Sequence, residues 1–392
     1  MKNIEKVKKF FNKIKILLKL IIRVKIIIST PNKQQLVIFD DTSLSDLEIL
    51  LKKYNYYVLK NRLENIDVIY LNIKIIKTTY TYYQGSIMSA YLSAIIHCIE
   101  PKVVLTFIDN SLKFSDLAKF FYGKINFIAV QNGSRIDSFS IKSKLFIPIF
   151  FCFGRSDVDQ YRKYNIKVDK FYIVGSLRLS NFIKKFKNLG NKNNLFDICF
   201  MADELIYDYE EELNIKNTKP GIIKLAKYIV KFCIKNNLSL ITIYKDDENR
   251  INFNKLKAEA SKIFNKKEEL IFFINSLNKK KYNRSNSYKI IQCSEVLCGS
   301  ISTMLKEKLA LGGKILSCNF MLNKIFDFPN DGICRISNCS FFDFEKRLLE
   351  IYAMSIKRYF LKIKKEKNYT MFFKKNISTI KLIQSKLDQF LE

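Results

Sequence analysis

Residues with clear chemical potential follow one another between positions 294 and 319, where the sequence reads SEVLCGSISTMLKEKLALGGKILSCN. The apolar run at 296–298 predicts a buried strand that Gly299 ends, and Ser302 and Thr303 stand where a helix should begin. The helix is expected to end at Gly312. Serine and threonine at a helix start can cap its free amides, but the same amides and hydroxyls can also bind a phosphate.

A carboxylate extends this arrangement. Glu307 lies four residues after Thr303, on the same face of the predicted helix and about 6 Å further along its axis. Amides for phosphate and a carboxylate for ribose hydroxyls together suit a nucleotide diphosphate. The candidate nucleotide site therefore consists of Gly299, Ser302, Thr303 and Glu307. The alternative is an ordinary helix cap followed by a solvated glutamate.

The elements that must position this site alternate between strand and helix. Apolar runs at 36–39, 102–108, 126–130, 149–153 and 171–174 predict parallel strands, with helices between them. Ligands of such doubly wound sheets bind beyond the carboxyl ends of the strands. The polar residues that fall at these ends are Asp109, Asn110, Gln131, Asn132, Gly133, Arg135 and Ser176.

A second alternation of the same kind follows, with strands predicted at 196–201, 238–243, 271–273 and 296–298. The expected fold class is therefore α/β, with two Rossmann-like domains facing a cleft. The expected divisions are a basic helix at 1–30, a first domain at 35–183, a linker at 184–194, a second domain at 195–355 and C-terminal helices at 356–392.

The N-terminal residues 1–28 combine apolar positions at helical spacing with a lysine every three to four residues. Such a segment cannot span a bilayer but is suited to lie in its interface, so contact with an anionic membrane is expected. The alternative is a helix that packs on the protein's own surface.

The composition excludes several classes of protein and of binding site. The net charge is +31 and the hydrophobic content is 48%, which excludes a disordered chain. The basic residues are mostly lysines spread along every segment, a pattern that does not indicate a nucleic-acid groove.

None of the nine cysteines forms a CxxC pair, so we expect reduced cysteines that pack as small hydrophobes. His97, in an apolar helix, is expected to belong to the core, and Asp157 and Asp159 of the DVD triplet to serve a helix start rather than a metal.

Several longer runs resemble a known family. The runs VVLTFIDN, INFIAVQNGSR, FFCFGRSDVDQYRKY and FYIVGSLR, followed by FDICFMADE and SYKIIQCSEVLCGSISTMLKEKLALGGKIL, resemble bacterial surface carbohydrate biosynthesis proteins. These are similar in turn to glycosyltransferases of the two-Rossmann (GT-B) type. The resemblance implies a nucleotide-sugar donor on the second domain and a glycan or lipid-linked acceptor on the first. It also implies surface polysaccharide synthesis at the inner face of the plasma membrane, without metal or cofactor.

One departure from the family pattern concerns catalysis. Related transferases often carry a histidine where this chain has Asn132, so a carboxylate would have to accept the acceptor's proton. Asp109 is the candidate base, with Arg135 to offset charge on the leaving phosphate. The alternatives are that Asp109 caps a turn and that Arg135 forms a surface ion pair. A nucleotide-sugar epimerase, a polyol-phosphate transferase and a non-catalytic assembly protein of the same fold stay open as alternatives.

Overall fold

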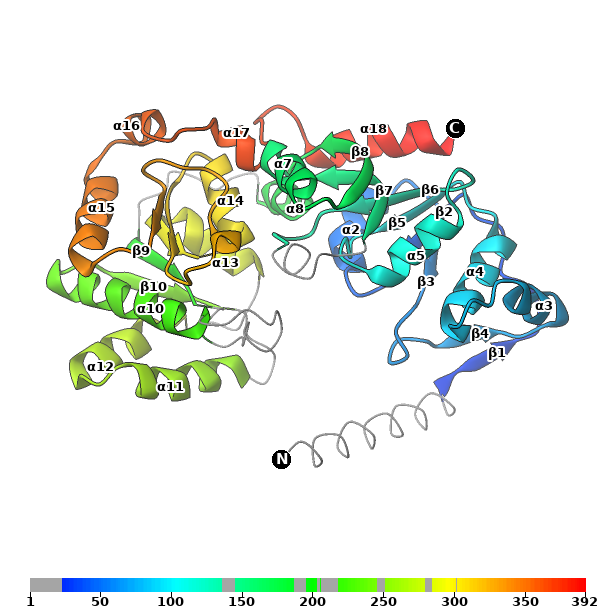
Figure 1. Ribbon diagram of the computed structural model, residues 1–392, viewed down its shortest axis with the longest axis horizontal. Helices are drawn as coiled ribbons and strands as arrows, with labels where there is room; N and C mark the ends of the chain where they lie inside the picture. The colour runs from blue at the N-terminus through cyan, green and yellow to red at the C-terminus, as the bar shows by residue number, and fades with distance from the viewer. Residues whose placement is uncertain are drawn as a thin grey trace.

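The protein folds into two α/β domains, each built on one parallel sheet (Figure 1). The computed structural model describes residues 23–135, 145–186, 195–202, 205, 218–244, 251–278, 284–300 and 302–392. The expected α/β class with two Rossmann-like domains is confirmed.

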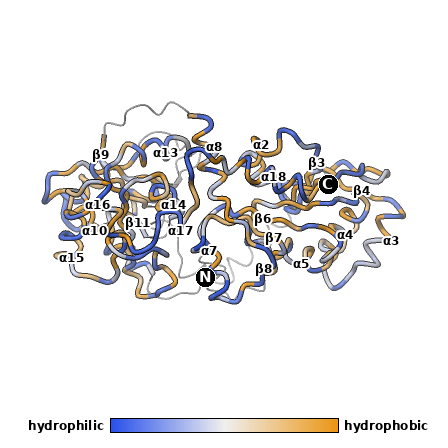
Figure 2. The backbone as a smooth tube through the Cα atoms, turned by 90° about the horizontal axis from the view of Figure 1, so that it is seen from above, coloured by the Kyte–Doolittle hydropathy of each residue, from blue (hydrophilic) through white to orange (hydrophobic). Residues whose placement is uncertain are grey.

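The first domain is organised around a six-stranded sheet with the order β3-β2-β5-β6-β7-β8. Its strands are β2 (Leu36–Phe39), β3 (Tyr56–Leu59), β5 (Val103–Thr106), β6 (Asn126–Val130), β7 (Phe146–Cys152) and β8 (Lys167–Ile173). β2, β5 and β7 are buried along their whole length, as parallel strands covered on both faces must be. In agreement with this burial, the central strands of this domain carry the hydrophobic colour in Figure 2.

Two layers of helices cover the sheet. One face packs against α4 (Ile87–Ile99), α5 (Leu112–Phe120) and α7 (Arg155–Lys163). The other packs against α2 (Leu44–Leu51), the start of α8 (Leu177–Lys185) and the C-terminal helix α18 (Thr379–Leu391). Beside these layers, β1 (Lys25–Ile27) pairs with β4 (Val68–Tyr70), and α3 (Ile73–Thr81) packs on α4.

The second domain has a five-stranded parallel sheet with the order β10-β9-β11-β12-β13. The strands are β9 (Phe196–Met201), β10 (Leu240–Ile243), β11 (Ser294–Gly299), β12 (Lys314–Asn319) and β13 (Arg335–Ser337). Its core also includes residues of α10 (Thr218–Lys235), α11 (Ile251–Ile263), α12 (Lys267–Ser276), α13 (Arg284–Gln292), α14 (Thr303–Ala310), the short 3-10 helix η2 (Lys324–Phe326) and α15 (Phe341–Ala353).

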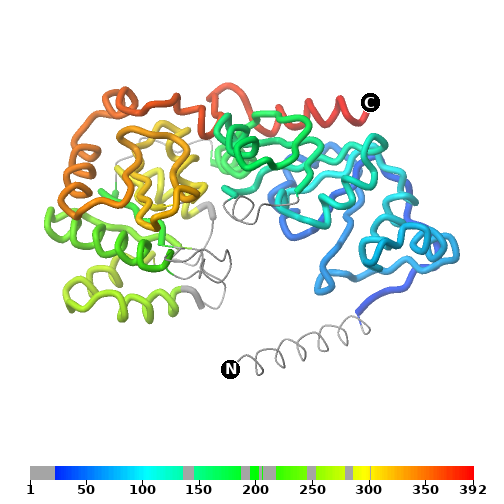
Figure 3. Tube along the Cα trace, viewed as in Figure 1, coloured from blue at the N-terminus to red at the C-terminus, as the bar shows by residue number. Residues whose placement is uncertain are grey.

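The chain then returns to the first domain, as the red segment in Figure 3 shows. After α16 (Ile356–Leu361), the short helix α17 (Lys367–Thr370) contacts both α7 and α14, and α18 packs on α2 and α8. This return requires two glycines. A Cβ on Gly154 would lie 2.6 Å from the carbonyl oxygen of Tyr369, and one on Gly175 would lie 2.2 Å from that of Phe372.

Three sequence-based expectations were wrong. Residues 271–273 are helical, within α12, because a short apolar run suits a buried helix as well as a strand. Residues 25–27, expected to end the basic helix, form β1, while residues 1–22 lie outside the described residues. His97 is exposed rather than in the core, and its Nδ1 lies 3.0 Å from the hydroxyl of Tyr82.

The expectation for the cysteines is confirmed. All nine are free, and seven of them are buried. Burial raises the pKa of the Cys199 thiol to about 12, so it is protonated at neutral pH and packs as an apolar group. Among the helices of the described residues, none has the length and apolar character needed to cross a membrane.

Candidate functional site at the meeting of the two sheets

Each sheet has one point where the strand order reverses, and there the loops diverge and leave a crevice. In the first domain this point lies between β2 and β5, and in the second between β9 and β11. Asp109 follows β5, and Ser302 follows β11. The candidate residues from the sequence therefore lie where a doubly wound sheet presents its ligand site.

Asp109 is the centre of a buried polar network in the first domain. Its carboxylate is 1% exposed and accepts a bond from Arg135 Nε at 3.0 Å, and a second guanidinium nitrogen, Nη2, donates to its other oxygen. The same Nη2 donates to Asn132 Oδ1, while Asn132 Nδ2 donates to the carbonyl of Phe107. A bidentate pair of this kind fixes the guanidinium plane. Asn132 therefore orients Arg135.

Gln131 holds the loop that follows β6. Its Nε2 donates to Gly133 O at 3.1 Å and to Asp157 Oδ1 at 2.9 Å, and its Oε1 accepts from Phe153 N at 2.8 Å. The same Asp157 oxygen pairs with Lys306 Nζ of α14 at 3.0 Å. Since the Lys306 and Asp157 side chains are only 5% and 2% exposed, this ion pair is a buried connection between the two domains.

The predicted donor helix touches the predicted acceptor loop directly. Ser302 caps α14 by accepting a bond from Met304 N at 3.2 Å, as its position predicts. The Thr303 hydroxyl instead accepts a bond from Ser134 N at 2.8 Å, across the two domains. Gly133 lies beside the same hydroxyl, since a Cβ built there would be 3.6 Å from Thr303 Oγ1.

Glu307 and Ser176 lie together in the domain interface. Glu307 is 3% exposed and accepts bonds from the hydroxyls of Ser176 at 2.6 Å and Tyr288 at 2.8 Å. Ser176 also caps α8 through Leu179 N. In this structure both residues join the domains, and their roles as ribose and substrate ligands stay predictions.

A small hollow lies between the two switch-point loops. It is lined by Ser134 and Arg135 of the first domain, by Ser300, Ser302 and Lys306 at the start of α14, and by the segment 325–329 after β12. Ser300 is 2% exposed, and within the described part of the chain its hydroxyl has no hydrogen-bond partner. A buried hydroxyl of this kind can donate a hydrogen bond to a ligand oxygen in the hollow.

The structure joins some of the predicted residues and separates others. Asp109, Asn132 and Arg135 form one network, and Ser302 shares the hollow with Arg135. Gly299 does not line the hollow; it ends β11 against Met201. Asn110 is half-buried in the turn after Asp109.

Sequence reasoning missed several residues of this region. Ser300 and Lys306 stand within the motif, but only the fold shows that Ser300 lines the hollow and that Lys306 pairs with Asp157. Arg178, whose Nη1 donates to Asn132 O at 2.7 Å and whose Nε donates to Asp46 Oδ2 at 3.0 Å, supports the loop from α8.

Of the DVD triplet, Asp157 serves the helix start, as predicted, whereas Asp159 bonds to the C-terminal segment. Asp157 Oδ2 accepts a bond from Gly154 N at the start of α7, at 3.2 Å, and Asp159 accepts one from the Tyr369 hydroxyl at 3.0 Å. Within the part of the chain that the structure describes, no group of three His, Cys, Asp or Glu side chains is arranged to hold a metal ion.

Comparison with known proteins shows the fold. No family model matches the sequence, and no curated protein matches it. A structure of UDP-GlcNAc 2-epimerase from Neisseria meningitidis bound to UDP-GlcNAc is 13% identical, with 90% of this chain and 99% of that chain covered and a TM-score of 0.50. A protein from Listeria monocytogenes assigned as a UDP-N-acetylglucosamine 2-epimerase is 11% identical, with 91% and 97% covered and a TM-score of 0.53. The chain therefore has the GT-B-like fold of two Rossmann-like domains.

Proposed function

We propose that this protein is a nucleotide-sugar enzyme, specifically a glycosyltransferase that moves a sugar from a nucleotide-sugar donor to a glycan or lipid-linked acceptor in surface polysaccharide synthesis. The observation that carries the proposal is the hollow between the two switch points. There a buried hydroxyl (Ser300), a helix start (Ser302) and a guanidinium (Arg135) converge. These are the donor groups that a diphosphate requires.

In this proposal the donor phosphates lie at the N-terminus of α14. The Ser300 and Ser302 hydroxyls donate to phosphate oxygens, and Arg135 offsets the charge that develops on the leaving diphosphate. The hollow also has a carboxylate, Asp327, between Phe326 and Phe328. Ribose hydroxyls can donate to Asp327 without opening the interface that buries Glu307.

In the structure, the loops of the two domains close around this site. The hollow measures about 30 Å³, which suffices for one or two waters. A diphosphate is larger, so its entry requires the contact between Ser134 and Thr303 to open. Binding then replaces the Ser134–Thr303 bond with bonds from the same groups to phosphate.

The proton chemistry is assigned to Asp109. While Arg135 is paired with it, the carboxylate is a weak base, because the guanidinium stabilises its charge. A shift of Arg135 toward the donor phosphate would leave Asp109 free to accept the acceptor hydroxyl's proton. The proposal requires no metal and no cofactor besides the donor substrate.

The donor site is tested by the double substitution Ser302→Ala and Thr303→Ala. Losing two hydroxyl contacts to phosphate should weaken nucleotide binding by about 1–3 kcal/mol, roughly ten- to a hundredfold, in calorimetric titration. Ser340→Ala is the matched control, because Ser340 caps α15 through Asp343 N at 3.1 Å and does not line the hollow. Unchanged affinity in the folded double variant would place the nucleotide elsewhere.

A second candidate is a nucleotide-sugar epimerase that uses the same donor pocket. It is supported by the fold that this chain shares with the two structures named above, which are those of UDP-N-acetylglucosamine 2-epimerases. The products separate the two candidates. An epimerase converts a nucleotide sugar to its epimer without an acceptor, whereas a transferase releases the nucleotide only as the sugar is transferred. Proton NMR of a nucleotide sugar incubated with the enzyme alone would detect the new epimer.

We also propose that the basic N-terminal segment holds the protein on the inner face of the plasma membrane. A truncation at residue 30 would remove β1 from its pairing with β4, so full-length variants are preferable. The combined change Lys6→Glu, Lys9→Glu and Lys13→Glu should abolish sedimentation with phosphatidylglycerol vesicles at low salt, since each basic residue near an anionic surface contributes about 1 kcal/mol.

The control for this experiment carries the same change of net charge on the second domain, at exposed lysines: Lys255→Glu, Lys266→Glu and Lys267→Glu. It should pellet like the wild type. Equal pelleting of both triple variants, or pelleting that high salt does not reduce, would exclude an electrostatic role for residues 1–22.

A further inference from the structure

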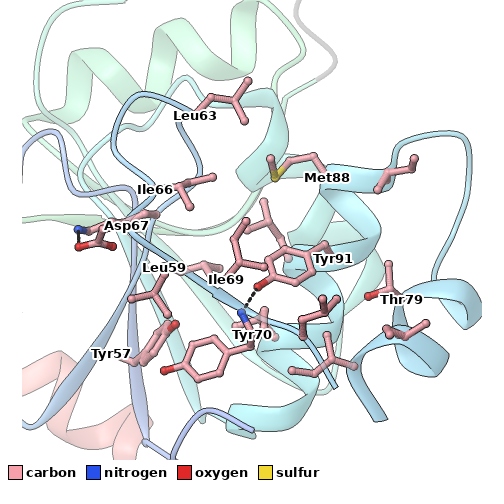
Figure 4. A pocket seen from close by; sticks show the side chains of 18 of the residues that line it. Tyr57, Leu59, Leu63, Ile66, Asp67, Ile69, Tyr70, Thr79, Met88 and Tyr91 are labelled. Carbon is pink, nitrogen blue, oxygen red and sulfur yellow. Dashed lines mark hydrogen bonds and ion pairs between the residues drawn. The ribbon is translucent and has the colours of Figure 1, made fainter. Parts of the chain in front are cut away.

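A large apolar cavity lies in the first domain and is separate from the hollow between the domains. It measures about 840 Å³, within the range of roughly 300–1,000 Å³ that small-molecule sites occupy. Its walls come from β3, the loop after β3, β4, α3 and α4 (Figure 4). None of the functions assigned above uses it.

The interior of this cavity is apolar. Leu59, Ile75, Leu92 and Ile95 form its buried part, each at most 3% exposed. The two charged side chains in the lining, Lys60 and Asp67, pair with each other at 2.7 Å. An occupant is therefore apolar along the part that enters.

Two tyrosines of the cavity wall, Tyr57 and Tyr91, are neutral. The Tyr91 hydroxyl accepts a hydrogen bond from Tyr70 N at 2.8 Å, as Figure 4 shows. Burial raises the pKa of Tyr91, and burial also raises that of Tyr57 well above its usual range. Both rings therefore add apolar surface to the walls.

The mouth of the cavity combines exposed apolar and basic side chains. Ile76 and Tyr80 of α3, Tyr83, and Ile87 of α4 line the cavity and are 53–84% exposed, the two extremes being Tyr83 and Tyr80. Lys74 and Lys77 do not line the cavity but are exposed on the same helix, Lys77 one turn before Tyr80 and Lys74 one turn before Lys77. Isoleucine and tyrosine beside lysine on one helix is the pattern of elements that lie at a membrane interface.

Charge decides which lipid fits. Across β1, β4 and α3 the charged side chains are Lys25, Lys74 and Lys77, and the nearest acid in the lining, Asp67, is already paired. We propose that this cavity takes a hydrocarbon chain of an anionic membrane lipid, whose headgroup lies against Lys74 and Lys77. Residues 1–22 are a less suitable occupant, because their seven lysines would carry charge into an apolar interior.

This lipid site goes beyond the donor site and does not depend on it. The chain contains no tryptophan, so a single introduced tryptophan reports only its own surroundings. Met88→Trp places the reporter in the cavity wall, and Ile73→Trp is the matched control on the same surface, 85% exposed and outside the lining. Both are made in the full chain and measured without nucleotide.

The probe is a vesicle of phosphatidylglycerol whose acyl chains are dibrominated, because bromine quenches tryptophan at contact. We expect Met88→Trp to be quenched strongly by these vesicles and weakly by dibrominated phosphatidylcholine, with Ile73→Trp quenched less than Met88→Trp. Adding Lys74→Glu and Lys77→Glu, both at exposed positions, should remove the quenching of Met88→Trp by phosphatidylglycerol.

Two results would overturn the proposal. One is unquenched Met88→Trp in protein that pellets with the vesicles, which would mean that the surface binds but no chain enters. The other is blue-shifted Met88→Trp emission without lipid that vesicles leave unchanged, which would mean that the chain's own residues 1–22 fill the mouth. Because nucleotide is absent, either result leaves the donor-site proposal as it stands.

Discussion

Asp109→Asn is expected to lower the turnover of sugar transfer by about 10²–10⁴-fold, the usual contribution of a general base. Asparagine keeps the size of the side chain and can still accept a bond from Arg135, but it cannot take the acceptor's proton. Nucleotide affinity should stay within about twofold, because a base acts on the chemical step and not on donor binding. The measurement is transfer at saturating donor beside calorimetric titration of the same variant.

The control for Asp109 is Asp40→Asn. Asp40 is also buried, at the end of β2, and pairs with Arg62 at 2.9 Å without lining the hollow. It should leave turnover nearly unchanged. If Asp109→Asn retains more than about a third of the turnover, Asp109 is not the base. If nucleotide affinity falls together with turnover, Asp109 is a positioning residue that acts through Arg135.

Lys306→Met should lower the free energy of unfolding by about 3–5 kcal/mol, because it leaves the Asp157 carboxylate buried without its counter-charge. Urea denaturation followed separately for each domain is the suitable measurement, since a two-domain chain need not unfold in one step. The first domain should lose stability as well as the second, because Asp157 lies on α7 and Lys306 on α14.

Lys119→Met provides the comparison. Lys119 pairs with Asp116 at 3.3 Å, but the two side chains are 47% and 64% exposed, and a pair of that kind contributes about 0–1 kcal/mol. Combining Lys306→Met with Asp157→Leu should recover part of the loss, since removing both charges costs less than removing one. Equal effects of Lys306→Met and Lys119→Met would show that the buried pair does not join the domains in solution.

The sheets could be predicted from the sequence because buried parallel strands carry a local signal. The runs at 36–39 and 126–130 match β2 and β6 residue for residue. The IFFI run in α12 misled because four apolar residues in succession have no period that separates a strand from a helix. β1 was missed for a related reason: its three residues continue the apolar pattern of the preceding segment.

The candidate site could be predicted only in part. A strand end or a helix start locates a residue in one domain, so Asp109 and Ser302 were placed on their loops correctly. What faces those residues is set by tertiary packing across the two domains, which sequence spacing does not encode. Glu307 illustrates the limit. Its position on α14 is as predicted, but its hydrogen-bond partners are Ser176, at the N-cap of α8, and Tyr288 of α13.

The central claim, a nucleotide site at the start of α14, is tested most directly by the melting temperature of the full-length protein with CMP, UDP, GDP and CDP sugars. A true ligand at a hundred times its Kd stabilises the folded state by about 2.7 kcal/mol, so one nucleotide class should raise the melting temperature by several degrees. The account predicts that this rise disappears when Ser302 and Thr303 are both replaced by alanine. No rise with any of the four classes, or the same rise in the double variant, would contradict it.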